Sequence, residues 1–305
     1  MDRQMKFVFV SYVNRSGSSF LLQHLSRINT FAVCPEAGCL VDILINGKNT
    51  GSIKDRLMKA IRQDMQLKYW KLTPDDINET MDQKSREGML LHVLTLYRNQ
   101  INSMADTIVF KHTSLFKLSN QLSDYADKII FLNLIRDPRG IFASQKCTVN
   151  PYTGRAFNKN PLICAYTWKQ LANQAVHRNP GYCRVETVRF EDLVVNPEKT
   201  VDDLLQLLQI GYRPEERNDT GNYFDRLPPP EIELHRDITG PADHSTMSAW
   251  KKKLKQSEIV LIEKHCSALM QYLLYEPSHT TSHPATIFLV EQYWKGRIFL
   301  GRDRY

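Results

Sequence analysis

Paired cysteines are missing from this 305-residue sequence. Its six cysteines lie far apart, without the CxxC pairs or the neighbouring histidines that zinc sites use. We therefore expect no metal site, and the pattern leaves the redox state of the thiols open. The six are Cys34, Cys39, Cys147, Cys164, Cys183 and Cys266.

Long apolar runs are also missing. The apolar stretch near the start, residues 6–10, contains too few apolar residues to span a bilayer. It continues directly into residues 14–17, NRSG, with no small-residue cleavage site of the kind that ends a signal peptide. We interpret this stretch as a buried strand, and we expect no membrane segment in this chain.

Blocks of like charge are absent as well. A formal charge of +7 and a pI near 9.0 favour an anionic ligand, but the basic residues are scattered, apart from the short run Lys251-Lys252-Lys253. Charge alone does not separate nucleic acid from a phosphorylated cofactor. The aromatic residues do not interleave with the basic ones as a single-strand binding surface requires, so we expect no nucleic-acid partner.

The chain does have the composition of a folded protein, with 42% hydrophobic and 24% charged residues. Short β-branched and aromatic runs alternate with longer segments of helical period, which predicts an α/β protein with a mainly parallel sheet flanked by helices. We expect a single domain over residues 1–305, with a core at about 6–274 and a helical C-terminal extension at 275–305.

The expected elements can be placed by this alternation. Two stretches rich in proline, glycine, asparagine or aspartate, 145–157 and 211–248, are predicted to be long loops, which are often binding elements or lids. The expected strands are 6–12, 31–35, 107–112, 128–135 and 183–190. The expected helices are 18–28, 54–66, 86–101, 158–178, 198–209, 257–274 and 287–297.

The first expected strand ends in a turn of small residues. Residues 14–21 read NRSGSSFL, and apolar residues follow at helical spacing. Such a turn lets backbone N–H groups converge on an anion at the positive end of a helix, although an ordinary helix N-cap would have the same sequence. The GxxxxGK[ST] signature of nucleotide hydrolases is absent, and the missing lysine argues against ATP or GTP hydrolysis.

A second motif follows the expected strand 128–135. Residues 136–144 read RDPRGIFAS, in which Asp137 is expected to cap a helix and Pro138 to begin it. Ser144 then follows Arg136 by two turns, so that both could face one phosphate, the arginine through its fork of donors and the serine through its hydroxyl. A local salt bridge between Arg136 and Asp137 is the structural alternative.

Together the two strings resemble the cofactor-binding motifs of sulfotransferases that use 3′-phosphoadenosine 5′-phosphosulfate (PAPS), above all the carbohydrate sulfotransferases. The resemblance spans roughly residues 6–274 and implies a three-layer, P-loop-like sulfotransferase fold. It implies that the second string binds the 3′-phosphate through Arg136 and Ser144. It also implies that the first string binds the 5′-phosphosulfate through Arg15, Ser16, Gly17, Ser18, Ser19 and Phe20.

Two later segments resemble the same family. Residues 188–193, VRFEDL, look like a family segment, Arg-Tyr-Glu-Asp-Leu, that lies beside the adenine. Phe190 replaces the tyrosine, which implies that stacking persists without the hydroxyl. Residues 245–254 resemble a Trp-Arg-x-x-Leu element that closes over the cofactor, and Lys251 stands at the arginine position.

The resemblance implies transfer of the sulfuryl group from PAPS to an acceptor hydroxyl by in-line displacement, with release of 3′,5′-ADP. Such a transfer needs a base, and it needs positive charge where the phosphosulfate bridge breaks. Arg15 is the candidate for stabilising the leaving group, and Lys111 is the candidate for contacting the sulfuryl oxygens. Glu36, which follows the expected strand 31–35, is the candidate base, since α/β sheets bind ligands at this end.

His112 is the alternative base. Cytosolic sulfotransferases end the corresponding strand in Lys-Thr-His and use the histidine, whereas this chain reads Lys111-His112-Thr113. The histidine therefore comes one residue early, and on a strand it points to the other face. The remaining histidines without a partner at catalytic spacing are interpreted as structural or surface residues: His24, His92, His235, His244 and His265.

The acceptor is predicted only as a class. The resemblance implies a hydroxyl acceptor on a glycan. Phenols, steroids, lipids and tyrosyl peptides stay open, because the sequences of the loops 37–60, 145–160 and 211–248 do not indicate which acceptor they bind. The alternative functions are a P-loop-like kinase or hydrolase and a non-catalytic binding protein. We expect a cytoplasmic location, with the Golgi lumen as the alternative if an N-terminal anchor is missing. Nothing predicts the oligomeric state.

Overall fold

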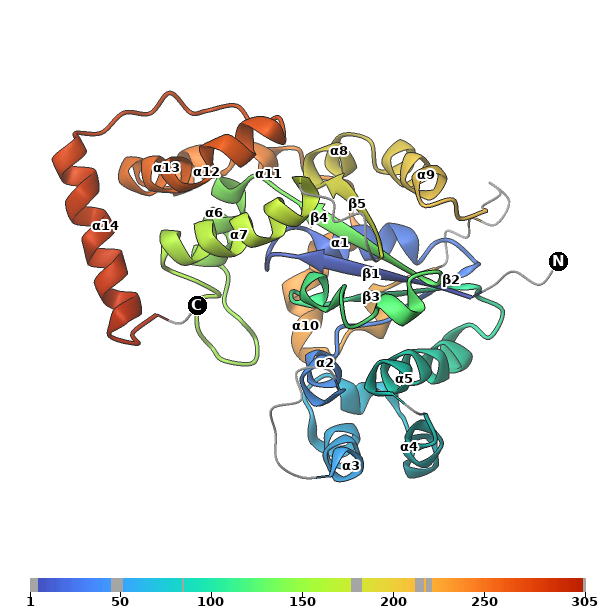
Figure 1. Ribbon diagram of the computed structural model, residues 1–305. Helices are drawn as coiled ribbons and strands as arrows, with labels where there is room; N and C mark the ends of the chain where they lie inside the picture. Colours follow the sequence, from blue (N-terminus) through green and yellow to red (C-terminus); the bar gives the residue numbers. More distant parts are fainter. Residues whose placement is uncertain are drawn as a thin grey trace.

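A five-stranded parallel sheet forms the centre of the computed structural model (Figure 1), which describes residues 5–44, 52–83, 85–176, 183–211, 217 and 221–303. The strand order is β2-β3-β1-β4-β5. This arrangement confirms the predicted α/β class and the parallel sheet. The strands are β1 (Lys6–Tyr12), β2 (Phe31–Val33), β3 (Thr107–Lys111), β4 (Ile129–Ile135) and β5 (Arg184–Arg189).

The central strands are buried on both faces. All seven residues of β4 are buried, and β1 pairs with it from Phe7 opposite Ile129 to Tyr12 opposite Leu134. Near-continuous apolar runs of this kind are typical of parallel strands covered on both sides by helices. The sequence therefore located each strand to within about two residues, because burial and apolar composition coincide here.

Helices cover both faces of the sheet and give the predicted three layers (Figure 1). One face packs on α1 (Ser18–Leu25), α8 (Phe190–Val195) and α9 (Pro197–Leu207). The opposite face packs on two groups. The first group is α2 (Gly38–Leu44), α3 (Ile53–Gln63), α4 (Pro74–Met81) and α5 (Arg86–Ile101); the second is α6 (Pro138–Cys147), α7 (Pro161–Val176) and α13 (Gln256–Tyr272).

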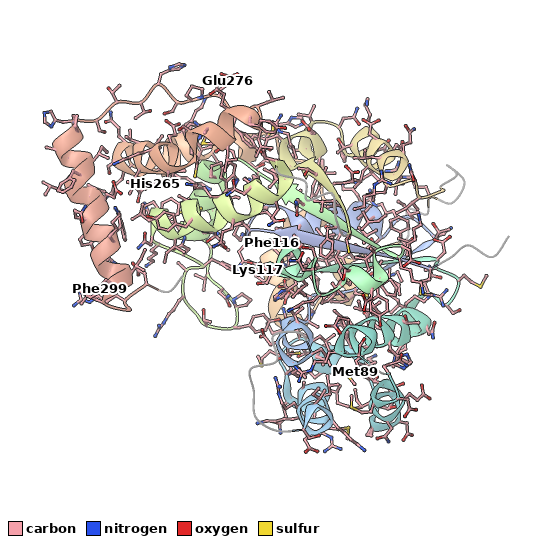
Figure 2. All side chains as sticks on the ribbon, in the orientation of Figure 1. Met89, Phe116, Lys117, His265, Glu276 and Phe299 are labelled. Carbon is pink, nitrogen blue, oxygen red and sulfur yellow. The ribbon has the colours of Figure 1, made fainter. Side chains whose placement is uncertain are left out.

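The last helix, α14 (Pro284–Phe299), packs on α7 and α13 through Leu162, Leu261 and Ile287. Its Glu291 forms ion pairs with Lys264 and Lys295, and Nε2 of His265, which is labelled in Figure 2, lies 3.3 Å from Oε1 of Glu291. Phe299, also labelled there, is 90% exposed at the helix end. Within the described ranges, no helix combines the length and apolar character needed to cross a bilayer.

The segment 211–248 differs from the predicted long loop, although residues 212–216 and 218–220 lie outside the described residues. It contains short helices: η5 (Phe224–Arg226), α10 (Pro229–Ile232), η6 (Glu233–Thr239) and α11 (Ser245–Ser248). The triple proline that suggested a loop instead begins α10, because proline suits the first helical position. The helices α2 and α4 also escaped prediction, since each spans about two turns and shows little periodicity.

Candidate active site

A cavity of about 840 Å³ lies at the carboxyl ends of the strands. Residues that follow all five strands line it: Arg15 after β1, Glu36 after β2, Lys111 at the end of β3, Arg136 after β4 and Phe190 after β5. Open parallel sheets bind their ligands at this edge. The two motifs recognised in the sequence, residues 15–20 and 136–144, thus open into one cavity.

The turn after β1 has an unusual backbone. Arg15 and Gly17 have positive φ angles of 75° and 89°, with Ser16 between them. The Ser16 amide and hydroxyl both donate to the carbonyl of Val13, over 3.0 and 2.6 Å. Ser16 is therefore fully buried and holds the turn together. It is not among the residues that line the cavity, and its expected part in cofactor binding stays a prediction.

Helix α1 presents its N-terminus to this cavity. Its first intrahelical bond runs from the N–H of Leu21 to the carbonyl of Gly17, and no side chain caps the helix. The amides of Ser18, Ser19 and Phe20 precede that bond and have no acceptor within the helix. All three residues line the cavity. Together with the helix dipole, these amides form a site suited to an anion.

Phe190 connects the two motifs. Its ring lies under the guanidinium of Arg136, with 4.2 Å between the guanidinium carbon and the ring centroid. The same ring lies against Gly17, where a Cβ would be only 2.3 Å from a ring carbon. Glycine at position 17 is therefore required both by its φ angle and by this close approach. The expected stacking partner of adenine is thus also a packing element of the loop.

Arg136 begins the second motif, and it is 8% exposed. Its guanidinium donates to the carbonyls of Arg15 and Thr246, both over 3.0 Å. Burial lowers the pKa of Arg136, while the nearby Glu191 carboxylate opposes that shift. Ser144 accepts a hydrogen bond from Nε of Arg15 over 3.2 Å. The two motifs are therefore joined by hydrogen bonds and also line the same cavity.

Helix α6 begins as its sequence predicted. Asp137 caps the helix by accepting from the N–H of Arg139 over 2.8 Å, and Pro138 occupies the first turn. Asp137 also pairs with the Arg139 side chain, at 2.7 Å. Asp137 thus pairs with Arg139, whereas Arg136, its partner in the structural alternative, lines the cavity.

Glu36 and Lys111 lie in the same cavity. The Tyr12 hydroxyl donates to Oε2 of Glu36 over 2.5 Å, and burial together with this carboxylate raises the pKa of Tyr12. Lys111 donates to the Ser19 hydroxyl over 2.9 Å. Burial lowers the pKa of Lys111, and the carboxylates of Glu36 and Glu231 oppose that shift. A carboxylate and a buried amine thus lie beside the anion site at α1.

His112 lies outside the cavity, although the Glu36 carboxylate is close enough to oppose the lowering of its pKa by burial. Its Nδ1 accepts from the N–H of Ser114 over 3.2 Å, and its ring lies next to Gly38. The reversal of side-chain direction between Lys111 and His112 follows the alternation of a strand. Lys111 therefore faces the cavity and His112 does not, as the sequence predicted.

Lys251 lies outside the main cavity, and its expected contact with the cofactor stays a prediction. Lys251 lines a separate groove beside Trp250 and Arg139, whereas Lys253 lines the main cavity. Both belong to α12 (Trp250–Lys253), and residues two apart point to different sides of a helix. The buried Trp250, stacked on Arg139 at 4.0 Å, fixes this orientation. Of the two lysines, Lys253 is thus the one whose ammonium can interact with an anion in the main cavity.

The sequence analysis did not assign a site role to several polar residues that line the cavity, among them Gln66, Tyr152, Glu231 and His235. His235 was interpreted as structural, yet its Nε2 lies 3.3 Å from the Ser19 hydroxyl. Burial and the charges of Lys111 and Arg15 lower the pKa of His235 to about 2, so the ring is neutral near pH 7. The i, i+4 spacing of Glu231 and His235 was the available signal, had the segment been recognised as helical.

A family model described as "Sulfotransferase family" matches residues 8–214. The chain belongs to the sulfotransferase family. Carbohydrate sulfotransferase 5 of Mus musculus is 23% identical over 193 residues, which are 57% of this chain and 49% of that protein. The chain thus spans about half the length of this curated relative.

Solved structures of sulfotransferases share the fold. The sulfotransferase domain of the Synechococcus PCC 7002 olefin synthase has a TM-score of 0.57 at 16% identity, with 90% of this chain and 98% of that one covered. The sulfotransferase domain of the curacin biosynthetic pathway has a TM-score of 0.53 at 18% identity, with 90% and 99% covered. Family and fold are those of sulfotransferase enzymes. Among the side chains described, no group of three or more His, Cys, Asp or Glu could hold a metal ion.

Proposed function

We propose that this protein transfers the sulfuryl group of PAPS to a hydroxyl of an acceptor and releases 3′,5′-ADP. One observation carries the proposal: the α1 amides and Arg136 lie in one cavity with Glu36 and Lys111. PAPS carries two separate anionic groups, and the two motifs offer two separate sets of donors. Glu36 and Lys111 offer the base and the positive charge that transfer to a hydroxyl requires.

The cavity residues fit PAPS in chemical character. The amides of Ser18, Ser19 and Phe20 and the Arg15 side chain would hold the phosphosulfate, since uncapped amides at a helix start favour an anion. Arg136 and Ser144 would hold the 3′-phosphate, because arginine offers paired donors to phosphate oxygens. PAPS would supply the activated sulfuryl group to the reaction.

The protein's own groups have distinct roles in this proposal. Glu36 would accept the proton of the attacking hydroxyl, and its hydrogen bond from Tyr12 orients the carboxylate. Lys111, which contacts Ser19 at the start of α1, would place positive charge beside the sulfuryl oxygens. Arg15 would stabilise the charge that develops on the leaving group. Positioning and charge, as in phosphoryl transfer, would supply most of the rate enhancement.

The proposed acceptor is a carbohydrate hydroxyl. Two observations support it: the distant relative named as a carbohydrate sulfotransferase and the polar character of the cavity near Glu36. Tyrosine, glutamine and carboxylate side chains in that region provide the hydrogen-bonding groups that sugars use. The cytoplasmic location stays a prediction.

The test combines binding with transfer. We expect the protein to bind 3′,5′-ADP without magnesium and to add the mass of a sulfuryl group to at least one member of a panel of glycans and small hydroxyl compounds supplied with PAPS. Binding of ATP in preference to 3′,5′-ADP would instead favour a kinase or hydrolase. Binding of 3′,5′-ADP without transfer to any compound would favour a non-catalytic binding protein.

A further inference from the structure

Glu231 is a buried carboxylate in the cavity, which Glu36 and Asp243 also line. It belongs to α10 and is 4% exposed, yet it lines the cavity. A buried carboxylate needs hydrogen-bond donors for both of its oxygens, because desolvation without donors is costly. An oxygen of Glu231 that lacks a donor from the protein is therefore a place where a ligand can donate a hydrogen bond.

One oxygen of Glu231 already has two donors. Oε1 accepts from Nε2 of Gln66 over 2.9 Å and from the hydroxyl of Tyr152 over 2.6 Å. The Gln66 amide is itself oriented, since its Oε1 accepts from the N–H of Gly38 over 3.2 Å. These bonds fix the Glu231 carboxylate in one orientation.

The other oxygen is placed differently. Oε2 lies 3.9 Å from Nε2 of His235, which is beyond hydrogen-bond distance. The His235 ring is neutral near pH 7 because burial and neighbouring cations lower its pKa to about 2. It therefore provides no charged partner for the carboxylate. Oε2 keeps acceptor capacity in a residue that lines the cavity.

The strand order places Glu231 on the acceptor side. The proposed anion-binding residues follow β1, β4 and β5, whereas Glu36 and Lys111 follow β2 and β3 at the other half of the sheet. Gln66 hydrogen-bonds to both Glu231 and Gly38, and Gly38 begins α2, two residues after Glu36. The charges of Glu36 and Glu231 both act on Lys111, so the two carboxylates lie near the same ammonium.

We propose that Glu231 determines acceptor specificity: its Oε2 accepts a hydrogen bond from a second hydroxyl or amine that neighbours the hydroxyl to be sulfated. This inference rests on the proposed function and narrows the acceptor to a diol, polyol or amino alcohol. A compound with a single hydroxyl would exclude water from Oε2 but would donate no hydrogen bond to this oxygen in its place. Sites built for such a hydrogen bond discriminate strongly against analogues that lack it.

The test compares vicinal cis-cyclohexanediol with cyclohexanol as acceptors. We expect the wild-type protein to prefer the diol by about tenfold or more in kcat/KM. Glu231→Gln keeps a carbonyl oxygen for Gln66 and Tyr152 but replaces the other oxygen with a donor, so the preference should fall to about unity. Glu233→Gln is the matched control, because it removes the same charge from the same segment at a side chain 74% exposed and outside the cavity. It should keep the full preference.

The affinity for 3′,5′-ADP separates the possible failures. If Glu231→Gln no longer binds 3′,5′-ADP, the comparison of the two alcohols is made with Glu231→Asp instead. This variant keeps the charge but moves the carboxylate away from the cavity, so it should also lose the preference for the diol. Equal use of the two alcohols by the wild type, or an unchanged preference in the Glu231 variants, overturns the inference and leaves the proposed function standing. Binding of 3′,5′-ADP without transfer to either alcohol also overturns it. A wild-type protein that neither binds 3′,5′-ADP nor transfers sulfuryl groups refutes the proposed function itself.

Discussion

The hydroxyl of Tyr12 donates a hydrogen bond of 2.5 Å to Oε2 of Glu36. Tyr12 is the last residue of β1 and Glu36 follows β2, so the bond joins two strands that are separated in the sheet by β3. Tyr12 is also 4% exposed and cannot easily turn away. The carboxylate is thus held by a rigid partner beside the anion site, as a general base should be.

Replacing the proposed base tests its role directly. Glu36→Gln should lower kcat by about a hundredfold or more, because general-base catalysis typically contributes that much, while 3′,5′-ADP affinity stays nearly unchanged. His112→Asn is the matched control: it keeps an acceptor for the N–H of Ser114 and lies outside the cavity. Steady-state kinetics of both variants decide between the two bases. Loss of turnover in His112→Asn alone would assign the base to the histidine.

The proposed 3′-phosphate site leads to a prediction about nucleotide binding. Arg136→Ala should weaken binding of 3′,5′-ADP far more than binding of 5′-AMP, by about tenfold or more, since only the former carries the 3′-phosphate. Calorimetric titration of the two nucleotides measures the ratio. Arg136→Lys serves as the comparison, because it keeps the charge but loses the paired donors. Equal weakening of both nucleotides by Arg136→Ala would show that Arg136 acts by holding the Arg15 and Thr246 carbonyls.

The parts of the site that sequence predicted are those fixed by local structure. Arg15, Glu36 and Lys111 each follow or end a buried strand, and the carboxyl ends of parallel strands necessarily meet at one edge of the sheet. The direction of His112 followed from strand alternation alone. For these residues, the apolar pattern that determines the fold also determines the position of the site.

The part of the cavity formed by Gln66, Tyr152 and Glu231 could not be predicted from the sequence in this way. Gln66, Tyr152 and Glu231 belong to three segments far apart in the chain, and each meets the others only through side-chain hydrogen bonds. No local pattern encodes such contacts. The place of Lys251 outside the main cavity has a related cause: the rotation of the short helix α12 is set by the packing of Trp250 on Arg139, which is a tertiary contact.

The neutral His235 predicts a pH dependence of stability. Its pKa in the folded protein is about 2, below the ordinary 6.5, so between these values the unfolded chain binds a proton that the folded protein does not. Stability should therefore fall as the pH drops below 6.5, by at most about 1.4 kcal/mol per pH unit from this residue. His235→Gln should reduce that slope, as measured by urea unfolding between about pH 5 and 7.

His244→Gln is the control for this measurement, because His244 is exposed. It should leave the slope unchanged. A slope that is the same in the wild type and in His235→Gln would mean that His235 takes up its proton in the folded protein as readily as in the unfolded chain. His24, whose pKa burial and Arg27 lower to about 4, adds to the slope in every variant and does not affect the comparison.

Gly17 allows the strain of a backbone angle to be separated from a steric clash. Gly17→Ala adds a methyl group at a φ angle of 89° and only 2.3 Å from the Phe190 ring, whereas Gly154→Ala adds one at 66° with nothing within 4 Å. Both should destabilise the protein by about 1 kcal/mol through backbone strain. Gly17→Ala should cost about 1–3 kcal/mol more, because the buried ring has to move. It should also weaken 3′,5′-ADP binding, since that ring supports Arg136. Equal losses of Tm and unchanged nucleotide affinity in the two variants would show that Phe190 yields without disturbing the site.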